Sequence, residues 1–294
     1  MEAIVIEVPG ILPEGVEYDA EGERFLFGSL TEGTIRQIME GGEAEPFIED
    51  EDLVSSVGIH VDTYNDRLLV ANSDASIFFG GEGPGMAGVA AYDLESGERL
   101  FLTDLGALLP DSGHFANDLT ADADGNVYVT DSLVPVIYKV DVDGNAEIFI
   151  EDEQLMGVGF GLNGIDYHPD GYLLAAVAGS ASIYKIPLDD PSALSAVELS
   201  EPLSIDGMVL APDGNTLYAI ATTGDLANGG LQEIVEVTSE DDWTMAEVTA
   251  RIETGGDATT VALRDGTPYF INVYFGNPDA EQYEIVPVTF EAVG

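Results

Sequence analysis

Oxygen-bearing side chains recur at one position of a segment that this 294-residue chain repeats. The six copies begin PEGVEYD, SVGIHVD, ANDLTAD, LNGIDYH, IDGMVLA and GDATTVA, and their second letters are Glu14, Val57, Asn117, Asn163, Asp206 and Asp257. A single Asp or Asn here would be read as a turn-capping residue at the start of a strand. Five carboxylates or amides in one column instead predict convergence on a shared point. Three carboxylates there would repel one another unless a cation lay between them.

The expected cation is Ca²⁺, with Mg²⁺ or another divalent ion as the alternative, because the column supplies hard oxygen ligands and neither Cys nor His. We predict Glu14, Asn117, Asn163 and Asp206 as the metal ligands. Asp257 belongs to the most degraded copy and is expected either behind these ligands or facing solvent. The chain has no cysteine, which excludes thiolate metal sites, disulfides and Cys nucleophiles.

The elements that must position this column are short β-strands. Each copy alternates apolar and polar residues around a DG, DGN or ND turn, which is a strong hairpin signal, and a second hairpin follows it. Four strands per unit at a spacing of roughly 50 residues are typical of propeller blades. We therefore predict an all-β fold, a single domain over residues 1–294 that forms a six-bladed β-propeller with four antiparallel strands per blade. The last copy runs out of chain, so the N-terminal segment EAIVIEV is expected to complete it.

Composition limits the partners of the protein. The formal net charge is −48, which argues against binding nucleic acid or an anionic membrane surface. No apolar run is long enough for a transmembrane helix, and no signal peptide is recognisable. An evenly acidic, lysine-poor surface suits work in high salt, either in a salt-adapted cytoplasm or after secretion into brine. The expected partner is a small-molecule substrate, and a monomer is expected.

The motifs PEGVEYD, ANDLTADADGNVYVTDS, LNGIDYHPDG and IDGMVLAPDG resemble those of the SMP-30/gluconolactonase superfamily, which includes diisopropylfluorophosphatase and the paraoxonases. This resemblance implies a catalytic Ca²⁺ held by Glu14, Asn117, Asn163 and Asp206. It implies a hydrolase of lactones, esters or phosphoesters, in which the ion acts as a Lewis acid at the floor of the central channel. Asp206 is then the expected catalytic residue, as general base toward water or as nucleophile.

The chain departs from this family pattern at several positions. Val57 stands where paraoxonase-like relatives place a His, so a His-assisted mechanism is in doubt. The loop Asn72 to Gly88 lacks the Arg with which sugar-lactone hydrolases of the family bind polyols, which makes gluconolactone a doubtful substrate. Phe78, Phe79 and Met86 in this loop predict either an apolar pocket wall or simple loop packing. Gly15 follows Glu14 where paraoxonases have an acid that helps hold a second calcium, although Asp118 follows Asn117 as in those enzymes.

The three histidines and Trp243 have expected places in the fold, and the sequence also allows one function other than a hydrolase. His114 is expected either near the pocket, as a proton shuttle or substrate contact, or as a hydrogen-bonded loop residue. His60 is expected to pack within a strand, His168 to be exposed in a hairpin turn, and Trp243 to pack on an outer strand. The alternative to a hydrolase is a non-catalytic propeller that binds a ligand or partner and holds a structural calcium, since propellers host many functions.

Overall fold

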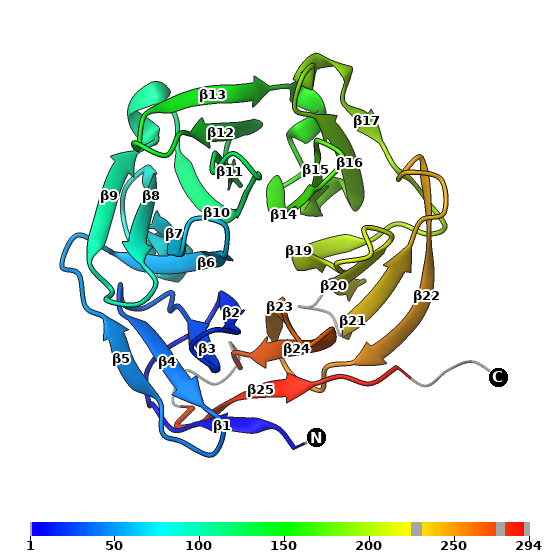
Figure 1. Ribbon diagram of the computed structural model, residues 1–294. Coiled ribbons are helices and arrows are strands. Elements are labelled where there is room, and N and C mark those ends of the chain that lie inside the picture. Colours follow the sequence, from blue (N-terminus) through cyan, green and yellow to red (C-terminus); the bar gives the residue numbers. More distant parts are fainter. Residues whose placement is uncertain (1, 225–230, 275–279, 291–294) are drawn as a thin grey trace.

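The computed structural model describes residues 2–224, 231–274 and 280–290. Its strands form sheets arranged in a ring around a central axis (Figure 1). The helical segments in the described part of the chain are all short 3₁₀ turns: η1 (Ala75–Phe79), η2 (Gly106–Leu108), η3 (Glu153–Leu155), η4 (Ala178–Ser180) and η5 (Pro191–Ala193). The predicted all-β propeller architecture is confirmed. Within the described residues, no helix is long and apolar enough to cross a membrane.

Of the described strands, six line the axis, and each contacts the next in a closed ring (Figure 1). These inner strands are β2 (Val16–Asp19), β6 (Ser55–Asp62), β10 (His114–Ala121), β14 (Leu162–His168), β19 (Ser204–Leu210) and β23 (Ala258–Arg264). Each inner strand overlaps one of the six copies of the repeated segment. The first residues of all six copies therefore lie at the same end of the axis.

The remaining strands extend outward from the inner ones. They are β3 (Arg24–Phe27), β4 (Ile35–Met39), β5 (Glu45–Ile48), β7 (Arg67–Ser73), β8 (Gly85–Asp93), β9 (Arg99–Asp104), β11 (Val127–Asp131), β12 (Val136–Val140), β13 (Ala146–Glu151), β15 (Tyr172–Val177), β16 (Ser182–Pro187), β17 (Ser195–Ala196), β18 (Glu198–Leu199), β20 (Thr216–Thr223), β21 (Leu231–Thr238), β22 (Met245–Glu253), β24 (Thr267–Asn272) and β25 (Tyr283–Pro287). Buried apolar clusters fill the space between neighbouring groups of strands.

The prediction of six blades with four antiparallel strands each is wrong, because the described strands form five hydrogen-bonded sheets and only three of these have four strands. Strands β6 to β13 belong to one eight-stranded sheet, since the long connection after β7 brings Gly85 and Met86 into parallel pairing with the start of β10. A further sheet has five strands, because β18 pairs in parallel with β22. Sequence alternation reports strands and hairpins but not such parallel contacts between neighbouring units.

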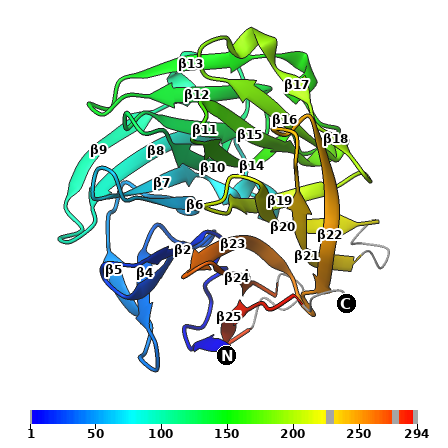
Figure 2. The ribbon, with the colours of Figure 1, turned by 45° about the vertical axis from the view of Figure 1, so that its right-hand side comes forward.

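The N-terminal strand β1 (Ile4–Ile6) pairs antiparallel with β25, as the sequence predicted for EAIVIEV. This sheet runs in the order β1-β25-β24-β23, so it joins the two ends of the chain (Figure 2). Pairing covers the edge that β25 would otherwise expose to solvent.

Close approach of the inner strands requires glycine directly after the column residues. A Cβ on Gly58 would lie 2.6 Å from the Asn117 carbonyl oxygen, and one on Gly164 would lie 2.6 Å from the Asp206 carbonyl oxygen. Both distances are shorter than packed atoms allow, so no larger residue fits without moving the backbone. The glycines let neighbouring inner strands approach closely around the axis.

Candidate functional site

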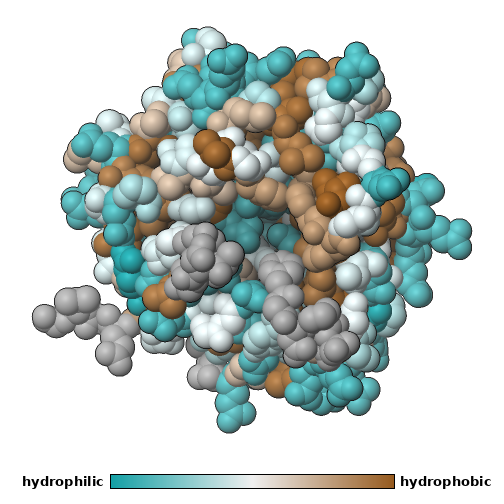
Figure 3. Space-filling view, turned by 180° about the vertical axis from the view of Figure 1, so that it is seen from behind, coloured by the Kyte–Doolittle hydropathy of each residue, from teal (hydrophilic) through white to brown (hydrophobic). Residues whose placement is uncertain are grey.

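A cavity of about 430 Å³ opens at the end of the axis where the inner strands begin. Seen from behind, the middle of the molecule is hollowed, with hydrophilic residues deep in the hollow and hydrophobic residues beside it (Figure 3). Glu14, Asn117, Asn163 and Asp206 all line this cavity, and we call these four residues the pocket floor. Glu14, Asn117 and Asn163 are buried and Asp206 is half-buried.

β-Bulges aim these side chains. The pairing of β10 with β11 shifts between Ala116 and Leu119, and the pairing of β14 with β15 shifts between Leu162 and Ile165. Asn117 and Asn163 are thus each the first of two residues that oppose a single residue on the partner strand, and Asp206 has the same position in β19. A bulge turns the side chain out of the regular pleat and bends the strand locally. The same local irregularity, repeated around the ring, brings together side chains that are far apart in sequence.

Hydrogen bonds orient the two floor amides. Asn117 donates from Nδ2 to Ser132 Oγ at 2.9 Å, and Ser132 Oγ in turn donates to the Leu162 carbonyl at 2.6 Å. Asn163 donates from Nδ2 to Asp206 Oδ1 at 3.0 Å. Among the described residues, Asn163 Oδ1 is buried and accepts no hydrogen bond. A buried amide oxygen without a donor is costly, and a cation would satisfy it.

The floor carboxyls are electrostatically strained. Burial, followed by repulsion from Asp206 and Asp118, raises the pKa of Glu14 well above its usual range. Burial raises the pKa of Asp206 to about 7, against the opposing effect of its hydrogen bond from Asn163. One buried carboxyl, one half-buried carboxyl and a buried amide oxygen without a donor form a donor set suited to a hard divalent ion. These residues therefore fit the Ca²⁺ that the sequence predicts.

The upper wall of the cavity is aromatic. Phe78, Phe79, Phe115 and Phe160 line it, and the ring of Phe78 lies 4.8 Å from that of Phe115 and 5.4 Å from that of Phe160. Phe78 and Phe79 end η1, whose start is capped by the Asp74 side chain, which accepts a hydrogen bond from the Ser76 amide. The long loop predicted around Phe78 thus contains an ordered turn that presents aromatic rings to the pocket.

Other residues singled out in the sequence lie in different places. Val57 lines the cavity beside the floor, and Asp257 lines it as well. The register of β23 shifts between Ala258 and Val261, so Thr259, and not Asp257, occupies the bulge position that matches the floor residues. Thr259 Oγ1 donates to the Glu14 carbonyl at 2.7 Å, which ties the last inner strand to the first.

His114 does not line the cavity. It is buried, with Nδ1 2.8 Å from Asp131 Oδ2 and Nε2 2.8 Å from the Leu109 carbonyl oxygen. This arrangement anchors the start of β10. The expectation that His168 is exposed is wrong, because it is buried with Nε2 3.0 Å from the Gly214 carbonyl oxygen of the next inner hairpin.

A second polar layer lies below the floor; the sequence singled out its Asp118, whereas Glu17 and Asp166 were missed and His60 was expected only to pack within a strand. Asp118 lines a cavity of about 10 Å³ directly beneath Glu14, Asn117 and Asn163. Asp118 also lines a further cavity of about 30 Å³, which we call the lower channel, together with Glu17, His60 and Asp166. The alignment contained the signal, because Glu17, His60 and Asp166 each stand three residues after a column position.

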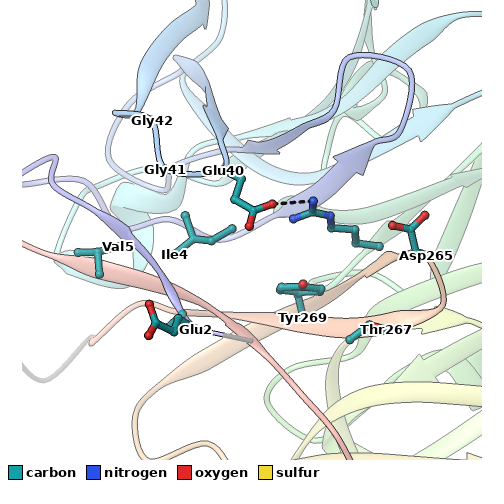
Figure 4. Close-up of a pocket in the computed structure, with 11 residues that line it drawn as sticks. Glu2, Ile4, Val5, Glu40, Gly41, Gly42, Asp265, Thr267 and Tyr269 are labelled. Carbon is teal, nitrogen blue, oxygen red and sulfur yellow. Dashed lines mark hydrogen bonds and ion pairs between the residues drawn. The ribbon is translucent and has the colours of Figure 1, made fainter.

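A larger cavity, of about 710 Å³, lies between the start of the chain at β1, the turn after β4 and the turn between β23 and β24 (Figure 4). Arg264 projects toward Glu40 there, with Nη2 2.9 Å from Oε2, and Glu2, Ile4 and Tyr269 complete the surroundings. This cavity holds no converging set of buried polar groups like the pocket floor. Volume alone therefore does not select the functional site.

Within the described residues, no three His, Cys, Asp or Glu side chains come together as a metal-holding group. To bind an ion, the pocket floor would need the amide oxygens of Asn117 and Asn163 as ligands in addition to its two carboxyls.

Comparisons with known proteins give the fold. No protein-family model matches this sequence, and no curated protein matches it. The solved structure of the allergen Mala s 1 from Malassezia sympodialis is similar, with a TM-score of 0.80, 18% identity, and coverage of 100% of this chain and 97% of that one. Regucalcin from Agrobacterium tumefaciens, described as a calcium-binding protein, has a TM-score of 0.66, 15% identity, and coverage of 98% and 94%. A luciferin-regenerating enzyme has a TM-score of 0.65, 13% identity, and coverage of 98% and 97%.

The structural neighbours therefore include SMP-30-like β-propeller proteins. At these identities the similarity establishes the fold alone. Function must be argued from the pocket itself.

Proposed function

We propose that the protein is a divalent-ion-dependent hydrolase of lactones, esters or phosphoesters, with Ca²⁺ as the expected ion. The observation that carries this proposal is the pocket floor, where four oxygen-bearing side chains from four parts of the chain meet and Asn163 Oδ1 is buried without a donor. Similarity to an enzyme and to a protein described as calcium-binding supports it.

Glu14, Asn117, Asn163 and Asp206 would hold the ion. A bound divalent ion polarises a carbonyl or phosphoryl oxygen and stabilises the negative charge that develops there. Asp206 is the proposed general base or nucleophile, because its carboxyl lines the cavity that would hold both the ion and the substrate. Ser132 fixes the direction of the Asn117 amide, which leaves Asn117 Oδ1 available to the pocket.

The pocket wall argues for an uncharged, apolar substrate. Four phenylalanines line it, and none of the described residues that line the cavity is Lys or Arg. The carboxylates of Glu14 and Asp206 would offset the two charges of the ion, so an anionic substrate would find no further positive charge among the described residues that line the cavity. A polyol would find aromatic rings where it needs hydrogen-bonding groups. Aryl esters and apolar lactones fit this wall better than sugar lactones.

Hydrolysis of a panel of lactones, aryl esters and organophosphate triesters, measured with calcium and with EDTA, tests the proposal. We expect turnover of apolar members that EDTA abolishes and added calcium restores. Asp206→Asn should lose this turnover, whereas the matched exposed variant Asp265→Asn should keep it. Chelator-insensitive turnover, or full activity of Asp206→Asn, would contradict the assigned chemistry.

The second candidate is a ligand-binding propeller whose ion is structural. The aromatic wall favours it, because packed rings give affinity for an apolar ligand without any chemistry. Calcium binding together with tight binding of an apolar ligand, and no turnover of any panel member, would support this candidate over the hydrolase.

A further inference from the structure

The lower channel gathers ionisable side chains from four different inner strands. Glu17 comes from β2, His60 from β6, Asp118 from β10 and Asp166 from β14. The cavity they share, about 30 Å³, has room for water or a single small ion. Three carboxyls facing so small a space would destabilise the fold unless something balanced their charge.

Neutral donors satisfy part of this need. Asp166 accepts hydrogen bonds from the Tyr167 amide, the Leu210 amide and Thr120 Oγ1. Asp118 accepts from the Leu119 and Ile165 amides. These donors stabilise the carboxylates but bring no positive charge.

His60 is the one basic side chain that lines the lower channel among the described residues. Its Nδ1 lies 3.4 Å from Glu17 Oε1, and its side chain is 25% exposed, so solvent can deliver a proton. Asp166 and Asp62 add further negative potential. The other two inner strands, β19 and β23, contribute Met208, Val209, Thr260 and Val261, which carry no charge.

We propose that a protonated His60 is the built-in cation of the lower channel, so that this part of the fold needs no metal ion. The resemblance to paraoxonases implies a second calcium held beside the acid after the ligand Glu, but Gly15 occupies that position here. In addition, no three His, Cys, Asp or Glu side chains of the described residues come together as a metal-holding group, so the lower channel does not fit a second ion. An imidazolium on β6 balances the carboxyls instead. The proposal concerns the lower channel and does not depend on whether the pocket floor binds an ion or catalyses hydrolysis.

The negative charge of the surrounding carboxylates favours the protonated form of His60. Although burial opposes it, the hydrogen bond and charge of Glu17, with smaller contributions from Asp166 and Asp62, raise the pKa of His60 to about 9. A raised pKa means that the folded protein holds this proton more tightly than the unfolded chain. The stabilisation is therefore complete below about pH 6.5 and disappears as the pH rises through about 9.

The first experiment measures thermal unfolding against pH in EDTA and concentrated KCl, which screens the exposed carboxylates. At pH 7, His60→Asn should lower the melting temperature by several degrees, and the difference from wild type should vanish above pH 9. His60→Lys should retain stability at pH 9.5, where the wild type has lost its imidazolium. Equal stability of His60→Asn and wild type at pH 7, or a difference that does not change with pH, would overturn the proposal.

The second experiment asks whether calcium can replace the imidazolium. Glu14→Gln combined with Asp206→Asn removes the charges of the pocket floor, so any remaining calcium response comes from elsewhere. In this background, we expect calcium to raise the melting temperature of an added His60→Asp variant and to leave the His60 parent unchanged. His60→Asn provides the same comparison if His60→Asp does not fold. A calcium response of equal size with His60 present would refute the proposal.

The two proposals can fail separately. A wild-type protein that binds no calcium removes the ion from the pocket floor but leaves the His60 pH dependence in EDTA intact. A wild-type stoichiometry of two calcium ions, one of them retained in the Glu14→Gln, Asp206→Asn background, refutes the lower-channel proposal while the floor proposal stands.

Discussion

Replacing Asp206 with Asn should change stability in opposite directions with and without calcium. Asp206 and Glu14 line the same cavity, and charge on Asp206 contributes to the raised pKa of Glu14. Without an ion, the substitution removes one of two repelling carboxylates while an Asn side chain can still accept the hydrogen bond from Asn163. With an ion, the same substitution removes a charged ligand. A residue that only supports the fold would not show this reversal.

The size of the stability change follows from the raised pKa of Asp206. Its pKa of about 7, against an ordinary 3.8, corresponds to roughly 4 kcal/mol against the ionised form, at about 1.4 kcal/mol per pH unit. Because the folded pKa is raised, this penalty grows as the pH increases from about 4 to about 7 and is complete at pH 8. At pH 8 in EDTA, Asp206→Asn should therefore gain roughly 1–4 kcal/mol. Loss of a charge-assisted contact should weaken calcium binding by roughly 10- to 150-fold.

Calorimetric unfolding at pH 5 and pH 8, with EDTA and with a calcium titration, measures both effects. Asp265→Asn is the matched control, because it removes one carboxylate from an exposed turn and reports the general benefit of lowering the net charge. A less stable Asp206→Asn protein in EDTA at pH 8 would refute the electrostatic reasoning. Unchanged calcium affinity would show that Asp206 is not a ligand.

Three further results should follow from the structure. Gly58→Ala places a Cβ 2.6 Å from the Asn117 carbonyl oxygen, so it should lower the free energy of unfolding by roughly 1–3 kcal/mol in chemical denaturation. Arg67→Ala leaves buried Asp62 without its ion pair and should cost roughly 3–5 kcal/mol, whereas Arg264→Ala breaks an exposed pair and should cost less than about 1 kcal/mol. Phe78→Ala should reduce kcat/KM for aryl esters by roughly 2- to 12-fold, with little change in melting temperature, because its ring contacts the pocket wall from an exposed position.

Each of these results has a clear contrary outcome. Full stability of Gly58→Ala would mean that the inner strands can separate without cost. Equal costs for the two arginine substitutions would mean that burial of the Arg67 pair does not matter. An unchanged kcat/KM for Phe78→Ala on aryl esters would remove the aromatic wall from substrate recognition.

Much of the fold was predictable from local patterns. Alternating runs and DG turns predict strands and hairpins, and the apolar start of the chain predicts the pairing of β1 with β25. The division into equal four-stranded units was not predictable. The parallel contact of Gly85 and Met86 with β10 depends on how a long connection folds back, and no local periodicity reports that.

The candidate site shows the same division. Glu14, Asn117, Asn163 and Asp206 were found because a repeat puts equivalent residues at equivalent places in a ring. The last copy was misaligned, since the position of its bulge, at Thr259, depends on pairing with β24 and not on the letters of the strand.

Residue types and their spacing thus determined the strands, the ring of repeats and the four oxygen-bearing side chains at its end. Only the tertiary structure decided how the strands join into sheets and that His60 lies among the carboxyls of the lower channel. It also decided that Asn163 Nδ2 donates to Asp206 while Asn163 Oδ1 has no donor among the described residues. The physical reason is that alternation and turn chemistry act over a few residues. Contacts across the axis instead join residues that are many tens of positions apart, and burial there sets their protonation and hydrogen bonding.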